Sequence, residues 1–289
     1  METVPKGKIL LERALRDAFG VPNDFVLAEE EIAGLHCHFQ HIVPYFIFFT
    51  ARSGSTFLTH ELRGTSALSY PHEWFNPGII AKTNMKEKFS FPEYTKNTVE
   101  KNVSKNGVFG SEIHWMALVA LNSIVPVEKI FPNKIRWFYL RRRNLVAQAI
   151  SHVIAVQSRI FHSYQLTETG LEPISGVKYD AELIKQEIIR ILHQEAGFEG
   201  WLRSFHVEPV RIYYEDIIED PKKVSMLFAN VMNVCLPEEY LKRTDGNPIK
   251  KIGSNRNSDF EQKFRSEESG FLLNALDRRP LILYPLRSI

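Results

Sequence analysis

Apolar residues along the first half of the chain recur with two different spacings, and each spacing indicates a type of element. Spacing of three or four positions predicts one or two short helices over Ile9–Phe19 and Asp24–Leu35. Runs of consecutive apolar and aromatic residues, which are typical of buried strands, occupy Tyr45–Thr50, Val108–Ile113 and Ile135–Leu140. A helical pattern follows each run. This alternation predicts an α/β fold, a three-layer sandwich in which helices flank a central parallel sheet.

The second half of the chain continues the pattern. It predicts a long helix over Asp180–Phe205 with Asp180 as the N-cap, a strand over Val210–Tyr214 and a helix over Pro221–Met232. These elements extend the same parallel sheet by one more strand.

Three stretches lack a regular spacing. Pro71–Lys105 and Phe161–Val177 are predicted as long loops, which in compact domains often cover a binding site. After Leu241, Lys and Arg residues are mixed with Gly and Asn, a composition that fits either a basic flap or a solvated surface.

The composition is that of an ordinary globular enzyme. The 289 residues are 44% hydrophobic and 24% charged, and we expect one main domain, residues 45–289, after a helical N-terminal extension, residues 1–44. Lys and Arg total 36 against 34 for Asp and Glu, so no nucleic-acid partner is expected. Cys37 and Cys235 have no metal-ligand spacing around them, so no metal is expected. The longest apolar run, Ile42–Ala51, is too short to span a bilayer and no signal-peptide pattern is seen, so we expect a cytoplasmic protein.

The loop after the first strand has the chemistry of an anion site. It consists of Arg52, Ser53, Gly54, Ser55 and Thr56. A strand that runs through small residues into a helix presents backbone N–H groups and the positive end of the helix dipole, which together bind phosphate. Taken alone, these residues also fit a serine-rich helix cap. The loop lacks the Lys of a nucleotide triphosphatase loop, which weakens a kinase or ATPase reading. The segment is therefore a P-loop-like strand, loop and helix.

A second basic loop follows the third strand. Arg141, Arg142 and Arg143 precede a helical pattern in which Gln148 and Ser151 share one face. An isolated arginine run is usually a solvated turn. Both basic loops, however, follow predicted strands at their carboxyl ends, where open parallel sheets bind ligands. Two anion sites imply a ligand with phosphate at two ends, such as a nucleotide that carries a 5'-phosphosulfate and a 3'-phosphate.

Further motifs follow these loops in order. They are Pro71 to Phe75, Gly107 to Gly110 with Trp115, and Tyr214 to Asp216 followed by Asp220 and Pro221. With them, the chain from about residue 45 to residue 265 resembles the sulfotransferases, within the bacterial carbohydrate branch that includes trehalose 2-sulfotransferase. The resemblance implies transfer of a sulfuryl group from 3'-phosphoadenosine-5'-phosphosulfate (PAPS) to a hydroxyl group, with a carbohydrate or glycoconjugate as the expected acceptor.

The resemblance assigns residues to the nucleotide. It implies that Arg52 to Thr56 hold the 5'-phosphosulfate and that Arg142, with Ser151, holds the 3'-phosphate. Arg143 is an alternative to Arg142. Arg256 lies in a segment with a looser likeness to the family's late basic flap.

The resemblance also assigns the chemistry. Glu73 is the implied general base, and a pKa raised by its aromatic neighbours would suit that role. His72 is the alternative base, and Arg52 would stabilise the leaving phosphate. Glu112 and His114 depart from the pattern expected of the branch.

Several alternatives stay open at the level of sequence. The acceptor could be a small alcohol, a phenol or a lipid headgroup in place of a carbohydrate. A non-catalytic nucleotide-binding module would keep the first loop and tolerate loss of Glu73. A homodimer is possible, because two-fold dimers are the commonest assembly.

Overall fold

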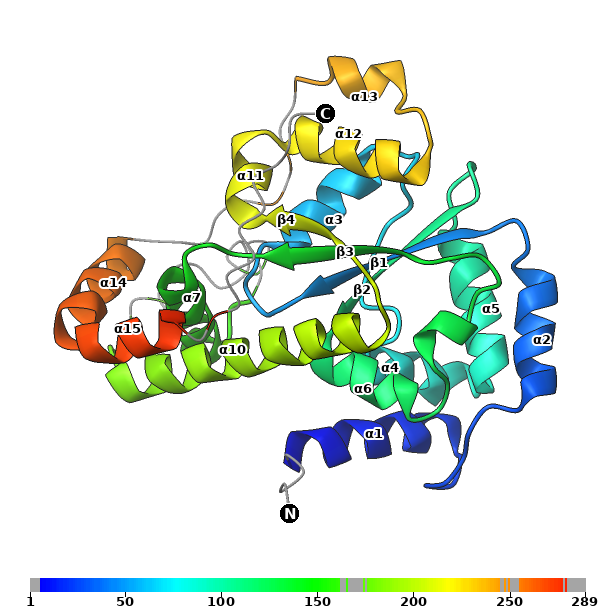
Figure 1. Ribbon diagram of the computed structural model, residues 1–289, viewed down its shortest axis with the longest axis horizontal. Helices are drawn as coiled ribbons and strands as arrows, with labels where there is room; N and C mark the ends of the chain where they lie inside the picture. The colour runs from blue at the N-terminus through cyan, green and yellow to red at the C-terminus, as the bar shows by residue number, and fades with distance from the viewer. Residues whose placement is uncertain are drawn as a thin grey trace. The chain divides into compact units, whose positions relative to one another are not determined.

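The computed structural model describes residues 6–161, 165, 174, 176–244, 247, 249, 255–277 and 279 (Figure 1). The chain divides into two compact units. The first unit comprises Met1–Arg143 with Val207–Ile249, and the second comprises Asn144–His206 with Lys250–Ile289. The expected extension, residues 1–44, falls within the first unit, and its standing as a separate domain stays a prediction.

A parallel sheet forms the centre of the first unit. Its described strands, in the spatial order β2-β1-β3-β4, are β1 (Val43–Phe49), β2 (Val108–His114), β3 (Arg136–Arg141) and β4 (Val210–Tyr213). The four predicted strands and their parallel pairing are thus confirmed. From β1 the chain turns toward β2, and from β3 it turns toward β4 on the opposite side. The carboxyl ends of β1 and β3 therefore form the point where strand order reverses, which is where such sheets bind ligands.

Both faces of this sheet are buried, as the continuous apolar runs predict. Alternate residues of β1 face opposite sides: Ile47 packs in a cluster with Leu58, whereas Phe48 stacks on Trp137 at 4.7 Å between ring centres. Helices α3 (Ser55–Gly64), α11 (Tyr214–Glu219) and α12 (Pro221–Met232) cover one face, and α4 (Pro77–Glu87), α5 (Phe91–Asn102) and α6 (Trp115–Asn122) lie on the other (Figure 1). The three layers expected from the sequence are confirmed.

The prediction of a long loop over Pro71–Lys105 is wrong, because α4 and α5 lie within it. Both helices have a proline in their first turn and an N-cap. Asn76 caps α4 by accepting a hydrogen bond from the Gly78 N–H, and Ser90 forms a capping box with Glu93 at the start of α5. These cap residues are the clearer sequence signal, since α4 has little apolar spacing and the buried face of α5 includes threonines.

The remaining elements of the first unit lie at its margins. They are α1 (Lys6–Phe19), α2 (Glu29–His38), the short 3-10 helix η1 (Val127–Lys129) and α13 (Glu238–Lys242). Helix α1 packs against α4 and α6. The buried Arg16 of α1 donates hydrogen bonds to the carbonyl groups of Phe25 and Ser123, both at 2.7 Å. This side chain fastens the first helix to the body of the unit.

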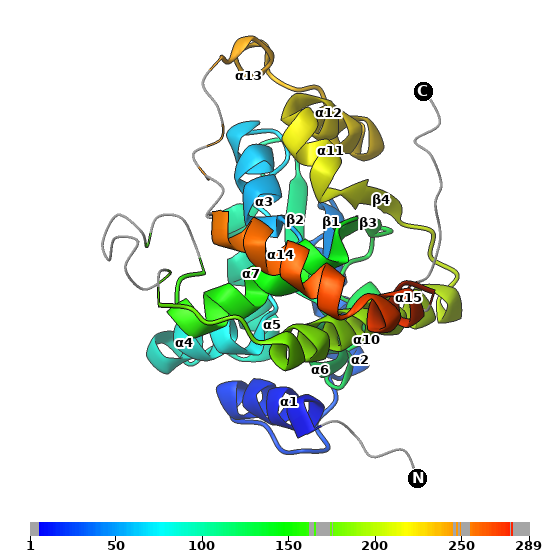
Figure 2. The ribbon, with the colours of Figure 1, turned by 90° about the vertical axis from the view of Figure 1, so that its left-hand side faces the viewer.

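The second unit is helical in its described part. It contains α7 (Leu145–Ser158), α10 (Ala181–Ser204), α14 (Asn255–Glu267) and α15 (Ser269–Asp277), and α7 packs against α10 and α14 (Figure 2). Asp180 caps α10 by accepting from the Leu183 N–H, as predicted. Most of the predicted loop Phe161–Val177 lies outside the described residues, and the basic tail contains α14 and α15. None of the described helices is long and apolar enough to cross a membrane.

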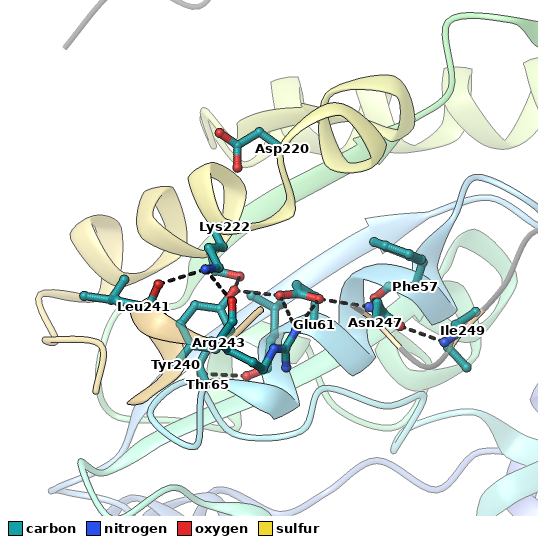
Figure 3. Close-up of polar contacts among 12 residues, drawn as sticks. Phe57, Glu61, Thr65, Asp220, Lys222, Tyr240, Leu241, Arg243, Asn247 and Ile249 are labelled. Carbon is teal, nitrogen blue, oxygen red and sulfur yellow. Dashed lines mark hydrogen bonds and ion pairs between the residues drawn. The ribbon is translucent and has the colours of Figure 1, made fainter. Parts of the chain in front are cut away.

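A buried carboxylate ties the segment after α13 to α3. Glu61 of α3 is only 2% exposed and accepts hydrogen bonds from the Tyr240 hydroxyl at 2.7 Å, from Arg243 Nη2 at 3.1 Å and from Asn247 Nδ2 at 3.1 Å (Figure 3). Asn247 Nδ2 also donates to the Phe57 carbonyl at 2.9 Å. Three side chains from residues 240–247, through four hydrogen bonds, thus fix the helix that follows the first basic loop.

Substitution of Arg243 by Ala should therefore destabilise the protein. Because the buried carboxyl group of Glu61 would lose its cationic partner, we expect the free energy of unfolding to fall by about 2 kcal/mol or more. Urea denaturation followed by circular dichroism measures this. Lys242→Ala is the matched control, since Lys242 pairs with Glu238 at the exposed surface. Equal unfolding midpoints for the two variants would contradict the role given to Glu61.

Candidate functional site

The backbone of the loop between β1 and α3 has a conformation that lets other groups approach it closely. Arg52 and Gly54 have positive φ angles of 62° and 95°, and the Ser53 N–H donates to the Thr50 carbonyl at 3.2 Å. A Cβ atom at Gly54 would lie 2.3 Å from a ring carbon of Tyr214, so no larger residue fits there. Helix α3 begins at the next residue, and its first-turn N–H groups have no partner within the helix. The predicted strand, loop and helix are confirmed.

Two guanidinium groups come together at this loop. Arg142, at the end of β3, donates from Nη1 to the Arg52 carbonyl at 3.4 Å and lies over the Tyr214 ring at 4.6 Å. Burial lowers the pKa of Arg52, and the charge of Arg142 lowers it further. The hydroxyl of Ser53 is fully buried and has no hydrogen-bond partner among the described residues. Two cationic groups of like charge near a helix N-terminus, with an unsatisfied buried hydroxyl in the same loop, have the chemistry that suits an anion.

Arg143 is held differently from Arg142. Its guanidinium donates to both carboxylate oxygens of Asp216, at 2.7 and 2.9 Å, and its backbone N–H donates to Glu215 at 3.1 Å. The hydrogen bond to Asp216 raises the pKa of Arg143. These contacts hold the start of α11 against the end of β3. Of the two arginines that the sequence left open, the geometry favours Arg142 as the neighbour of the first loop.

Two further predicted ligands of the nucleotide belong to the second unit. Ser151 is half-buried on α7, one turn after the fully buried Gln148. Arg256 of α14 donates from Nη1 to the carbonyl groups of Ile174 at 3.0 Å and Val177 at 2.8 Å. The assignment of Ser151 and Arg256 to the nucleotide stays a prediction.

Glu73 is oriented by two residues that cap helices. The Asn76 Nδ2 donates to Glu73 Oε2 at 2.7 Å, and His114 Nε2 lies 3.9 Å from the same oxygen. His114 Nδ1 accepts from the Ala117 N–H at 3.2 Å, so neutral His114 carries its proton on Nε2, toward Glu73. Burial raises the pKa of Glu73, and the hydrogen bond from Asn76 opposes this rise. The arrangement suits a carboxylate whose affinity for a proton is raised, as a general base requires.

A second carboxyl group lies close to Glu73. Glu112 of β2 is 6% exposed, and its side chain shares a hydrogen bond with Ser55 at the start of α3. Burial raises the pKa of Glu112 well above its ordinary value and the charge of Glu73 raises it further, whereas the hydrogen bond with Ser55 opposes this rise. Sequence reasoning noted Glu112 only as a departure from the family pattern. The signal that could have identified Glu112 is a carboxyl group within an otherwise buried strand.

Partly exposed aromatic rings gather around the segment that contains Glu73, and two of them are its neighbours in sequence. They form what we call the aromatic platform, which consists of His60, Tyr70, His72 and Trp74. The His72 ring centre lies 5.0 Å from that of Trp74 and 5.8 Å from that of Tyr70, and His60 lies 5.7 Å from Tyr70. Burial lowers the pKa of His72, and nearby His60 lowers it further. Neutral rings on both sides of a carboxylate suit a polar molecule with apolar faces.

Comparison with known sequences identifies the family. The sequence model of the Stf0 sulphotransferases matches residues 44–268, which is most of the chain. The chain belongs to the Stf0 sulphotransferase family. It is therefore a sulfotransferase, an enzyme that transfers a sulfuryl group, as the sequence motifs predict. The match begins at β1 and includes both basic loops, Glu73 and Glu112.

Curated relatives of this Stf0 sulphotransferase are distant in sequence. Trehalose 2-sulfotransferase from Mycobacterium tuberculosis (strain Erdman) is 19% identical over 262 residues, which cover 78% of this chain and 95% of that protein. Trehalose 2-sulfotransferase from Mycolicibacterium smegmatis is 22% identical over 221 residues, which cover 61% of this chain and 78% of that protein. The chain is therefore similar along most of their length.

Among solved structures, the sulfotransferase domain of the Synechococcus PCC 7002 olefin synthase is similar with a TM-score of 0.49. The two are 15% identical, and the alignment covers 85% of this chain and 96% of that domain. Within the described ranges of this Stf0 protein, no group of three or more His, Cys, Asp or Glu side chains is arranged to hold a metal ion. That the reaction needs no metal stays a prediction.

Proposed function

We propose that this Stf0 sulfotransferase uses PAPS as the donor and transfers its sulfuryl group to a hydroxyl group of a carbohydrate. One observation carries the choice of donor. Arg52 and Arg142 come from the neighbouring loops after β1 and β3, where strand order reverses, and Arg142 contacts the Arg52 backbone carbonyl. A donor with phosphate at two ends needs positive charge from two loops, and each of these loops contributes one arginine.

The residues at the first loop fit the phosphosulfate end of this donor. The N–H groups at the start of α3 and the buried hydroxyl of Ser53 are hydrogen-bond donors, and Arg52 contributes a full charge. Arg142 stands at the end of β3 and is proposed to hold the 3'-phosphate. Ser151 is proposed for the same phosphate on the resemblance alone.

Bound PAPS supplies a sulfuryl group on a leaving phosphate. Glu73 is proposed to take the proton of the acceptor hydroxyl as that oxygen bonds to sulfur and the bond from sulfur to the phosphate oxygen breaks. Arg52 and the loop N–H groups stabilise the charge that develops on the leaving phosphate. His72 is the alternative base, and burial keeps its imidazole neutral and able to accept a proton.

The acceptor class is supported by the aromatic platform. Sugar rings present C–H faces that pack on aromatic rings, and Trp74 and His72 flank Glu73 in sequence. The curated relatives are named for trehalose, a carbohydrate. Phenols would stack on the same rings, whereas small alcohols would gain little from them.

Turnover of PAPS tests this function. Purified protein is incubated with PAPS and separate panels of sugars, phenols, small alcohols and glycolipids, and sulfated product is detected by mass spectrometry. We expect a sulfated sugar. Sulfation confined to another panel would overturn the carbohydrate assignment, and binding of PAPS without any product would support the non-catalytic alternative.

Trp74→Ala tests the platform. Loss of one stacking ring should raise the KM for a sugar acceptor by about 3- to 10-fold, because aromatic stacking contributes about 0.5–1.5 kcal/mol. Trp74→Phe keeps a ring and should stay near wild type. The affinity for adenosine 3',5'-bisphosphate, measured by calorimetry, should not change in either variant. A KM for the acceptor that is insensitive to Trp74→Ala would remove Trp74 from the acceptor site.

A cytoplasmic location and a homodimer are proposed only as predictions from the sequence. Cys37 and Cys235 are both exposed and neither forms a disulfide. Exposed thiols of this kind are typical of proteins in a reducing compartment.

A further inference from the structure

The position of Glu112 places a carboxyl group directly beneath the first basic loop. Glu112 pairs in register with Ile47 of β1, and residues in register on parallel strands project from the same face. Ile47 packs against Leu58 of α3, so the Glu112 side chain projects toward α3 as well. There it shares a hydrogen bond with Ser55, the first residue of the helix.

The hydrogen bond with Ser55 lowers the pKa of Glu112, but burial and the other surroundings outweigh it and oppose a negative charge. Glu73, from the segment before α4, lies close enough for its charge to disfavour a second one. Tyr45 of β1 is buried nearby, and its hydroxyl donates to the Leu68 carbonyl at 2.7 Å. His114, two residues further along β2, has its Nδ1 occupied by a backbone N–H of α6. Glu112 Oε1 is buried without a hydrogen-bond partner among the described residues, which would be costly for a carboxylate.

We propose that Glu112 is a positioning residue, a neutral acid that donates its proton to Ser55 Oγ and so turns the Ser55 hydroxyl toward the anion bound at the loop. This inference rests on the proposed function. The proton on the Glu112 carboxyl group is an addition to the roles already proposed for the loop residues and for Glu73.

The direction of the hydrogen bond between Glu112 and Ser55 determines whether the Ser55 hydroxyl can donate to the bound anion. An ionised Glu112 can only accept from the Ser55 O–H, which would then be lost to the bound anion. A neutral Glu112 donates to Ser55 Oγ, and the hydroxyl proton is free to point at the anion. An ionised Glu112 would also place negative charge beside that anion. The anion and the ionised form of Glu112 therefore disfavour each other, and by linkage anion binding promotes proton uptake.

Protonation of Glu112 also favours the role of Glu73 as the proposed base. Two carboxyl groups this close do not both ionise readily, and environments that separate their protonation assign them different roles. With Glu112 neutral, Glu73 can ionise and accept the acceptor proton.

Calorimetric titration with adenosine 3',5'-bisphosphate tests the inference in wild type, Glu112→Gln and Glu112→Leu. Each protein is titrated at neutral and at alkaline pH. Buffers of different ionisation enthalpy are used so that proton uptake on binding can be measured. The Gln amide donates to Ser55 Oγ without charge, so Glu112→Gln should match wild type at neutral pH. As Glu112 ionises, wild-type affinity should fall by up to about tenfold per pH unit with proton uptake on binding. Glu112→Gln should lack this fall and this uptake, and Glu112→Leu should bind about tenfold more weakly at neutral pH.

The matched control is Glu128→Gln. Burial raises the pKa of Glu128 as well, but this residue lies in η1, away from the loop. The ligand's own phosphate titrates near pH 6 in every variant, so differences between variants carry the result.

The inference is overturned if Glu112→Gln keeps the pH dependence of wild type or loses most of its affinity at neutral pH, although wild-type binding would still support the proposed function. If Glu112→Gln does not fold, the wild-type protein decides, because binding without proton uptake at alkaline pH overturns the inference. Failure of the folded wild type to bind the nucleotide at all would overturn both proposals.

Discussion

Replacing Glu73 by Gln is expected to lower kcat for sulfuryl transfer by about 10²- to 10⁴-fold, the usual contribution of a general base. The amide cannot accept the proton of the acceptor hydroxyl, although it keeps the shape of the side chain and a carbonyl oxygen for Asn76. Binding of adenosine 3',5'-bisphosphate should stay near wild type. Initial rates at saturating donor and acceptor measure kcat, and calorimetry measures binding.

The pH profile distinguishes Glu73 from other groups. A base must be ionised, so wild-type kcat should fall as pH drops through the pKa of Glu73, which burial raises above the ordinary value of a glutamate. Glu73→Gln should lack this acidic limb. Glu87→Gln, at the exposed end of α4, is the control and should keep both rate and profile. If His72→Gln abolishes the limb and Glu73→Gln does not, His72 is the base.

Removal of either arginine at the two loops should strongly weaken nucleotide binding. Arg52→Ala and Arg142→Ala should each cost about 2–5 kcal/mol, or roughly 30- to several-thousand-fold in Kd for adenosine 3',5'-bisphosphate, because a bound phosphate group loses a charged partner. Added salt should weaken nucleotide binding by the wild type, because charge screening weakens the same contacts. The difference in Kd between the wild type and each variant should therefore shrink as the salt concentration rises. Calorimetric titration without magnesium measures both effects.

Arg136→Ala is the matched control for these variants. Arg136 is exposed at the opposite end of β3 from Arg142, so its removal changes the net charge by the same amount without touching the loops. Wild-type affinity is expected. If all three arginine variants weaken binding equally, the effect is one of overall charge, and the pair at the loops is not the nucleotide site.

The sheet was predictable because its strands are buried on both faces. Runs such as Tyr45–Thr50 have no polar alternation, and parallel strands under helices have this character. The first loop was predictable for a related reason, since Gly54 and its small polar neighbours leave few alternatives between a strand and a helix. The first of the two helices over residues 77–102 has little apolar spacing, and the buried face of the second includes threonines, so their caps are the clearer sequence signal.

The chemistry around the loop could be predicted only in part. Sequence named Glu73, but the contacts with Asn76 and His114 depend on how two helices begin in space. The preference for Arg142 over Arg143 stays a proposal, and it rests on the position of Asp216, far along the chain, which holds Arg143. The role proposed for Glu112 depends on the register of β2 on β1, which places its side chain next to Ser55.

Titration of the folded wild-type protein with adenosine 3',5'-bisphosphate and with adenosine 5'-monophosphate, without magnesium, tests the central claim that two loops bind a nucleotide at both of its ends. The account predicts that the bisphosphate binds at one site per chain and that loss of the 3'-phosphate weakens binding by about tenfold or more. Equal affinity for the two nucleotides would contradict a two-ended site, and no binding of either would contradict the assignment of PAPS as the donor.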